Sequence, residues 1–96
     1  MDKKSALEAL QQFRQENGSH YGILSLGLFG STARDTATES SDVDVVISLK
    51  KPNLLTLSKI RVELEDRLHR HVDIVSYRER MNPFLKERIQ RDVSYV

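Results

Sequence analysis

Residues 23–49 read ILSLGLF, then GSTARDTATESSD, then VDVVISL, and they carry the clearest information on the fold. Two short apolar runs, 23–29 and 43–49, enclose a polar segment that is rich in Ser and Thr. The first run has turn chemistry on both sides and the second is rich in β-branched residues, so each is predicted to be a strand. The polar segment has room for one helical turn but not for a full crossover helix, which predicts that at least part of the sheet is antiparallel.

A helix is predicted before the first strand, over residues 5–17. Ser5 with Glu8 three residues later fits a capping box, and Asn17-Gly18 is a stop signal.

The second half of the chain predicts two more helices and a third strand. Apolar residues recur at helical spacing from 54 to 70, residues 71–77 alternate as a strand, and Asn82-Pro83 predicts the start of a last helix. This order of elements predicts an α+β fold, in which helices flank a small mixed three-stranded sheet.

Composition limits the possible functions. The chain of 96 residues has no linker or repeat, which predicts a single domain over 1–96. The absence of cysteine excludes a disulfide framework, a thiol nucleophile and a zinc site built on thiolates. No apolar run approaches the ~20 residues of a membrane span and the polar start is unlike a signal peptide, so we expect a cytoplasmic domain without a membrane partner.

The charge is unevenly distributed, although the formal net charge is only +1. Residues 49–96 carry 11 basic and 7 acidic side chains. Solvated helix faces are the favoured interpretation, and an RNA or an acidic partner is the alternative. Because no aromatic residues are interleaved with the basic ones, nucleic-acid binding is not expected.

Three aspartates stand out once the strands are drawn. Asp42 and Asp44 are two residues apart at the start of the second strand, so their side chains project from the same face. Asp73 lies within the third strand, between apolar neighbours, where an acidic residue is normally unwelcome. If the two strands are neighbours, the three carboxylates converge and repel one another, and Mg²⁺ would relieve that repulsion. The alternative for the Asp42 and Asp44 pair alone is a solvated strand start or an N-cap.

Gly30-Ser31 directly follows the first apolar strand. Glycine permits a close approach of the backbone, and successive N–H groups at such a turn bind phosphate oxygens. The Ser31 hydroxyl adds a donor. A plain turn is the alternative for these two residues taken alone.

The combination of these features is more specific than its parts. Residues 30–35 (GSTARD) and 41–45 (SDVDV) give Gly-Ser, ten residues, then Asp-x-Asp. This pattern resembles the signature of the DNA polymerase β-like nucleotidyltransferase superfamily, and it looks most like the minimal nucleotidyltransferases (MNT). The resemblance continues through residues 72–75 (VDIV), similar to the family's third-carboxylate strand. It extends to residues 82–89 (NPFLKERI), similar to MNT proteins that pair with HEPN partners, and so covers nearly the whole chain.

The resemblance implies a nucleoside triphosphate donor, ATP, and two Mg²⁺ ions. By position, Asp42 and Asp44 would hold the metals, and Asp73 would complete the metal nearer the acceptor and help to activate its hydroxyl. Gly30 and Ser31 would hold the β- and γ-phosphates.

Two residues after the Gly-Ser pair are less simply assigned. Arg34 could bind a phosphate, or it could brace the turn by bonding Asp35 or the strand end. Asp35 stands where the MNT pattern has Gly, which suggests a tighter or more acidic turn.

The resemblance implies that the chain transfers AMP to a tyrosine of a HEPN ribonuclease toxin and so acts as an antitoxin. The short chain leaves no further domain to hold an acceptor, which favours a protein acceptor. One alternative is a catalytically silent module that neutralises its partner by binding alone, and the intact Asp42, Asp44 and Asp73 argue against it. Another is a small-molecule nucleotidyltransferase, for example one acting on aminoglycosides.

Overall fold

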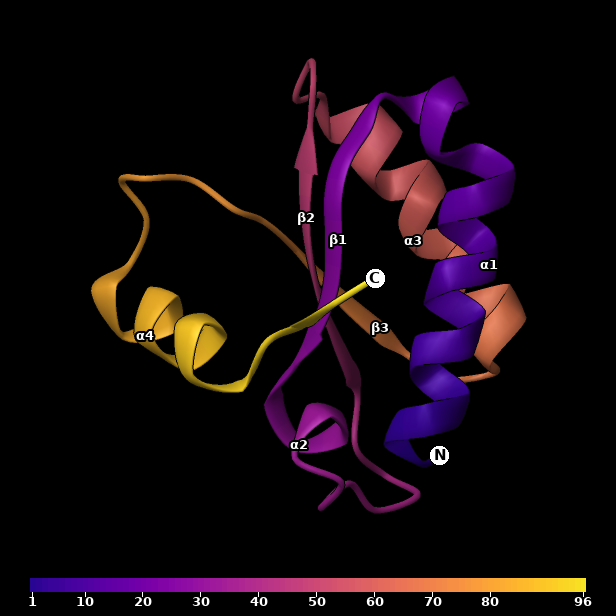
Figure 1. The fold of residues 1–96 in the computed structure, drawn as a ribbon, viewed down its shortest axis with the longest axis vertical. Coiled ribbons are helices and arrows are strands. Elements are labelled where there is room, and N and C mark those ends of the chain that lie inside the picture. The colour runs from indigo at the N-terminus through magenta and orange to yellow at the C-terminus, as the bar shows by residue number, and fades with distance from the viewer.

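The computed structural model describes residues 1–96, which form four helices and four strands in one sheet (Figure 1). The elements are α1 (Lys3–Tyr21), β1 (Ile23–Phe29), α2 (Gly30–Ala33), β2 (Val43–Leu49), α3 (Leu54–Leu68), β3 (Val72–Ser76), α4 (Pro83–Asp92) and β4 (Ser94–Tyr95). The strand order is β3-β2-β1-β4. The sheet is mixed, because β1 is antiparallel to β2 and β4 whereas β2 is parallel to β3. None of the helices is both long and apolar enough to cross a membrane.

The α+β class and the mixed sheet are confirmed, but the predicted number of three strands is wrong. The fourth strand, β4, has only two residues and pairs with Gly27 and Leu28 of β1. Two residues are too few to show a strand periodicity in the sequence, so β4 forms only through its pairing with β1. Gly27 makes room for it, because a Cβ there would lie 2.9 Å from side-chain atoms of both Val93 and Tyr95.

Helix α1 is longer at both ends than the predicted 5–17. Its N-cap is Asp2, whose carboxylate accepts the N–H of Ser5 at 2.8 Å. The helix then continues through Gly18 to Tyr21, whose ring stacks on that of Phe13 at 6.3 Å between centroids. Packing of the last turn against the core therefore outweighs the helix-breaking tendency of the Asn-Gly pair.

The two faces of the sheet bury different apolar clusters. Helices α1 and α3 cover one face, and α4 lies on the other (Figure 1). On the first face the helices contribute Ala6, Leu10, Phe13, Ile60, Leu64 and Leu68. The second cluster is smaller and is formed by Phe29, Val46 and Ile89. Since residues of a strand alternate in direction, Asp44 shares the α4 face with Val46.

We predict that Gly27→Ala destabilises the protein by about 1–3 kcal/mol, because the new Cβ overlaps β4. The N–H of Val96, which donates to the Leu26 carbonyl at 2.9 Å, should lose protection from hydrogen exchange. Urea unfolding and amide exchange would measure the two effects.

Gly18→Ala is the matched control for that substitution. Its Cβ meets nothing closer than 3.5 Å inside α1, so we expect a gain of up to about 1 kcal/mol. If Gly27→Ala were as stable as the parent protein, β4 would not require a residue without a Cβ at position 27.

Candidate active site

The structure brings two of the three predicted aspartates into direct register. Asp44 of β2 is the parallel partner of Asp73 of β3, so the two side chains project from the same face of the sheet. The Asp44 side chain is 18% exposed, whereas Asp73 lies open to solvent at the edge of the sheet. Asp42 precedes β2 by one residue and lies at the same end of this face.

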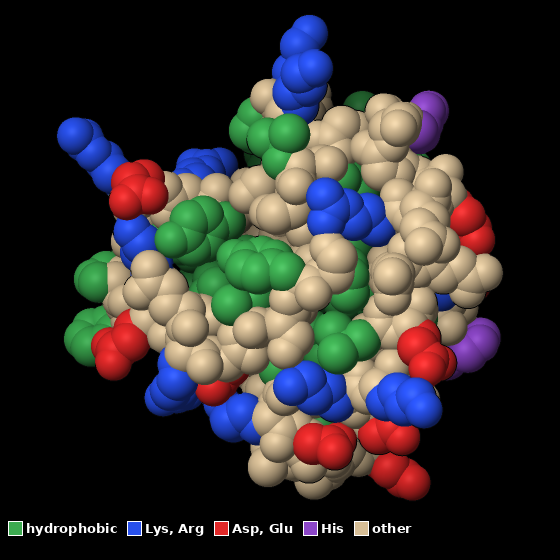
Figure 2. All heavy atoms as spheres, viewed as in Figure 1, with side chains coloured by type: hydrophobic (Ala, Val, Ile, Leu, Met, Phe, Trp, Pro, Cys, Tyr) green, Lys and Arg blue, Asp and Glu red, His purple; other side chains and the backbone are tan.

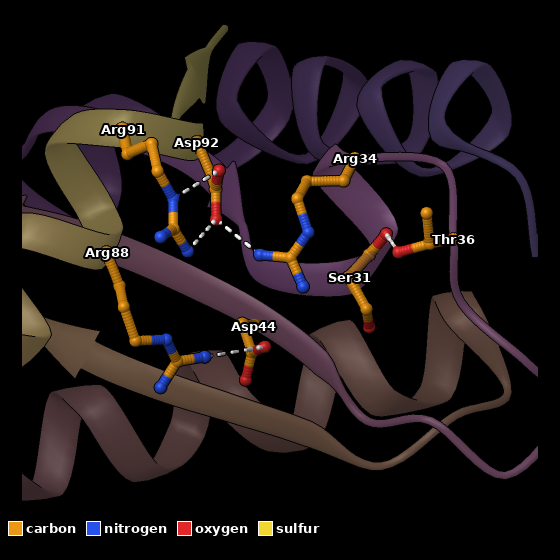
Figure 3. Close-up of polar contacts among 7 residues, drawn as sticks. All are labelled: Ser31, Arg34, Thr36, Asp44, Arg88, Arg91 and Asp92. Atoms are coloured by element: carbon orange, nitrogen blue, oxygen red, sulfur yellow. Dashed lines mark hydrogen bonds and ion pairs between the residues drawn. The ribbon is translucent and has the colours of Figure 1, made fainter.

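The pKa of Asp44 is affected by the charged groups around it. Burial raises the pKa of its carboxyl above the ordinary value of 3.8, and the carboxylates of Asp73 and Asp42 raise it further. Arg88 and Arg34 act in the opposite direction and lower it. Figure 3 shows these two arginines on either side of Asp44. The site therefore holds an excess of negative charge that a bound cation would relieve.

Asp42 contacts a histidine. Its Oδ1 lies 3.4 Å from Nδ1 of His71, and Nε2 of that ring lies 3.9 Å from Glu65. In this arrangement no group of three or more His, Asp or Glu side chains is placed to hold a metal ion. The donor chemistry nevertheless fits a hard divalent cation, because Asp44 and Asp73 supply adjacent carboxylates. Asp42 is 55% exposed and so has room to turn toward them.

Gly30 sets the close contact between the turn and the central strand. Its φ of 74° is left-handed, and a Cβ at this position would lie 2.2 Å from Oδ2 of Asp44. The backbone at Gly30 therefore passes directly over that carboxylate. Helix α2 begins here, and the Ser31 carbonyl holds the end of the turn by accepting the N–H of Thr36 at 2.9 Å.

Arg34 braces α2 against α4. Its Nη1 donates to Oδ2 of Asp92 at 2.6 Å, and the Asp92 side chain is only 5% exposed. Arg91 bonds the same carboxylate through Nε at 3.2 Å and Nη2 at 3.3 Å (Figure 3). The bonds from Arg91, followed by that from Arg34, hold the pKa of Asp92 below its usual value. Arg34 therefore braces the turn through Asp92, a partner that the sequence did not suggest. Phosphate binding by Arg34 stays a prediction.

Asp35 explains how a residue other than glycine fits the turn. Its φ is 59°, a left-handed conformation that Asp tolerates better than most residues. The carboxylate accepts the N–H of Lys3 at 3.2 Å and so ties the turn to the start of α1. The turn keeps the conformation that glycine would favour and gains an additional contact.

Sequence analysis missed Arg88 and Asp92, which α4 brings to the site. Nη2 of Arg88 lies 3.9 Å from Oδ2 of Asp44, and its guanidinium carbon lies 5.8 Å above the centre of the Phe29 ring. The sequence does contain Arg88, Arg91 and Asp92 at helical spacing, which predicts that they lie on one side of α4. This spacing alone does not distinguish an active-site surface from a solvated one, because it does not show what α4 packs against.

We predict that Gly30→Ala costs about 2 kcal/mol or more of stability, since it combines left-handed strain with a clash against Asp44. Gly22→Ala is the control, because its φ of 66° is similar and its nearest contact is an ordinary 3.4 Å. Urea unfolding of both variants would isolate the clash. Equal losses would mean that Asp44 moves aside at no cost.

We also predict that Asp44→Asn is more stable than the parent protein at pH 7. A carboxyl whose pKa is raised on folding favours the folded state below its unfolded value and loses that contribution as the pH rises through the folded value. The advantage of the variant should therefore shrink as the pH falls toward about 3.8. Denaturant midpoints across this range would test it. A parent protein more stable than the variant at pH 7 would show that the arginines outweigh burial.

Comparison with known proteins identifies the family of this chain. Residues 10–96 match the family model described as "Nucleotidyltransferase domain". The chain is 34% identical over 90 residues to MJ0126 of Methanocaldococcus jannaschii, whose name provisionally assigns it as a protein adenylyltransferase. The match covers 93% of this chain and 92% of that protein.

Solved structures share the fold. One, described provisionally as a minimal nucleotidyltransferase, superimposes with a TM-score of 0.78 at 32% identity and covers 98% of this chain and 95% of its own. A complex of a tri-AMPylated Shewanella oneidensis HEPN toxin with an MNT antitoxin matches with a TM-score of 0.70 at 15% identity, over 97% of this chain and 70% of that one. The second likeness concerns the fold alone. From the family match and the relatives above 30% identity, the chain belongs to the nucleotidyltransferase domain family.

Proposed function

We propose that this nucleotidyltransferase uses ATP and Mg²⁺ to transfer AMP to a tyrosine hydroxyl of a HEPN-type toxin, and that it acts as the antitoxin of that protein. The observation that carries the proposal is the convergence of Asp44 and Asp73 on one face, directly beneath the Gly30-Ser31 turn. Acidic side chains next to a turn that begins a helix suit the two ends of a magnesium–triphosphate complex. The near full-length match to a protein adenylyltransferase supports a protein as the acceptor.

Each residue has a defined role in this proposal. Asp42 and Asp44 hold the two Mg²⁺ ions, and Asp73 completes the site nearer the acceptor. When bound, the ions neutralise charge on the reacting phosphates. The N–H groups at Gly30 and Ser31, with the Ser31 hydroxyl, donate to the β- and γ-phosphate oxygens.

The reaction is an in-line displacement at the α-phosphorus. The acceptor hydroxyl oxygen forms a bond to that phosphorus, and the bond from the α-phosphorus to the bridging oxygen breaks. Pyrophosphate leaves with the bonding electrons, and Asp73 accepts the proton of the hydroxyl. Because Asp73 is exposed at the edge of the sheet, a side chain of another protein can reach it.

The surface beside the site supports a protein partner. Figure 2 shows hydrophobic side chains gathered on the face formed by α4 and the C-terminal strand, with Lys and Arg side chains around them. Two exposed aromatic residues belong to these elements: Phe84 of α4 is 77% exposed and Tyr95 of β4 is 54% exposed. Exposed aromatic residues with a charged rim are typical of protein-binding surfaces.

The decisive experiment is an intact-mass measurement. A HEPN-type toxin protein is incubated with this chain, ATP and Mg²⁺. We expect its mass to rise by one or more AMP groups, and the increase to fall at least about 100-fold in rate with the Asp42→Asn, Asp44→Asn double variant. Asp66→Asn is the control, because Asp66 is exposed on α3 at the opposite face.

The other outcomes separate the competing functions. No mass increase together with a tight complex would favour a silent binding module, and the double variant would then still neutralise the toxin. Pyrophosphate release that depends on an aminoglycoside and not on the partner protein would favour a small-molecule transferase.

A further inference from the structure

Arg88 is the only basic side chain within ion-pair distance of Asp44. The 3.9 Å between its Nη2 and Oδ2 of Asp44 makes this a long pair, and the Arg88 side chain is 50% exposed. Arg34, the other cation near Asp44, is tied to Asp92 at 2.6 Å. Arg88 is therefore the cation of the site that is free to change partners.

The position of Arg88 is set by the packing of α4. The next residue, Ile89, is fully buried against Phe29 and Val46, so the helix cannot rotate freely. One turn further on, the buried carboxylate of Asp92 is held by Arg34 across the site. The Phe29 ring beneath the guanidinium further limits where Arg88 can go. The fold thus directs a guanidinium toward the carboxylate of Asp44.

A divalent cation and this guanidinium compete for the same carboxylate. Both are positive, and a cation bound to Asp44 would repel Arg88, whose Nη2 lies 3.9 Å from Oδ2 of the same carboxylate. A nucleotide arriving with that cation brings phosphate oxygens, which a planar guanidinium binds in a bidentate manner. Moving from Asp44 to a phosphate thus exchanges one anionic partner for another.

We infer that Arg88 is the counterion of Asp44 when no metal is bound and becomes a phosphate ligand when nucleotide and divalent cation bind together. This inference rests on the proposed function, because it requires a metal–triphosphate complex at Asp44. It assigns α4 a direct part in nucleotide binding, in addition to its packing on the sheet.

The test measures the affinity for Mn²⁺ and the affinity for an ATP analogue, which Arg88→Gln is expected to change in opposite directions. Mn²⁺ binding is measured without nucleotide by electron paramagnetic resonance, and binding of a non-hydrolysable ATP analogue is measured with Mg²⁺ by calorimetry. Arg88→Gln should bind Mn²⁺ several-fold more tightly, because the competing cation is gone. It should bind the analogue about tenfold more weakly, because a charged hydrogen bond to phosphate is lost.

Two further variants sharpen the result. Arg88→Lys keeps the charge but not the fork of donors, so Mn²⁺ binding should return to the parent value while analogue binding stays weak. Arg80→Gln removes an exposed arginine from the loop before α4 and should change neither constant. A merely structural role of Arg88 would weaken both bindings together.

The outcomes distinguish this inference from the proposed function. If the parent protein binds Mn²⁺ and the analogue, but Arg88→Gln changes neither constant, or only one, or both in the same direction, the exchange is wrong and the proposed function stands. If the parent protein binds neither Mn²⁺ nor the analogue, the proposed function is overturned, and the inference with it.

Discussion

The pairing of β2 with both β1 and β3 fixes the positions of the core and of the candidate active site. Val43, Val45 and Ile47 of β2 are almost completely buried against α1 and α3, which fixes the direction of every residue between them. The same alternation forces Asp44 onto the opposite face, beside Asp73. A slip of one residue would turn the carboxylate of Asp44 into the larger core and move the apolar side chains of Val43, Val45 and Ile47 to the α4 face. The hydrophobic core therefore determines the position of the catalytic candidates.

That arrangement has a cost in stability that the protein tolerates. The largely buried carboxyl of Asp44 lies near two other carboxylates, and its raised pKa indicates that the ionised form is disfavoured there. Gly30 adds a left-handed residue directly against it. Strain and crowded charge concentrated at one place are typical of sites that are completed by a ligand. In the proposed reaction, a bound cation would offset the repulsion among these carboxylates, and the phosphates would bind at the strained turn.

Helix α4 connects the site to the C-terminal part of the chain. Asp92 receives Arg34 from the turn and Arg91 from its own helix, and its low exposure protects these bonds from solvent. Ile89 packs on the sheet from the same helix, and Arg88 reaches Asp44. A basic segment that composition alone assigns to a solvated surface therefore contributes one of the walls of the site.

The α+β class, the three longer strands and the pattern of glycine, serine and aspartates could be predicted from the amino-acid sequence, because they depend on local periodicity and on residue types at short spacing. The sequence also placed Asp42, Asp44 and Asp73 as candidates, since strand alternation is a local rule. The two-residue β4, the partner of Arg34 and the approach of Arg88 to Asp44 could not be predicted, because they depend on long-range packing. Each of these joins residues far apart in the chain, and no local pattern states which surfaces will pack together.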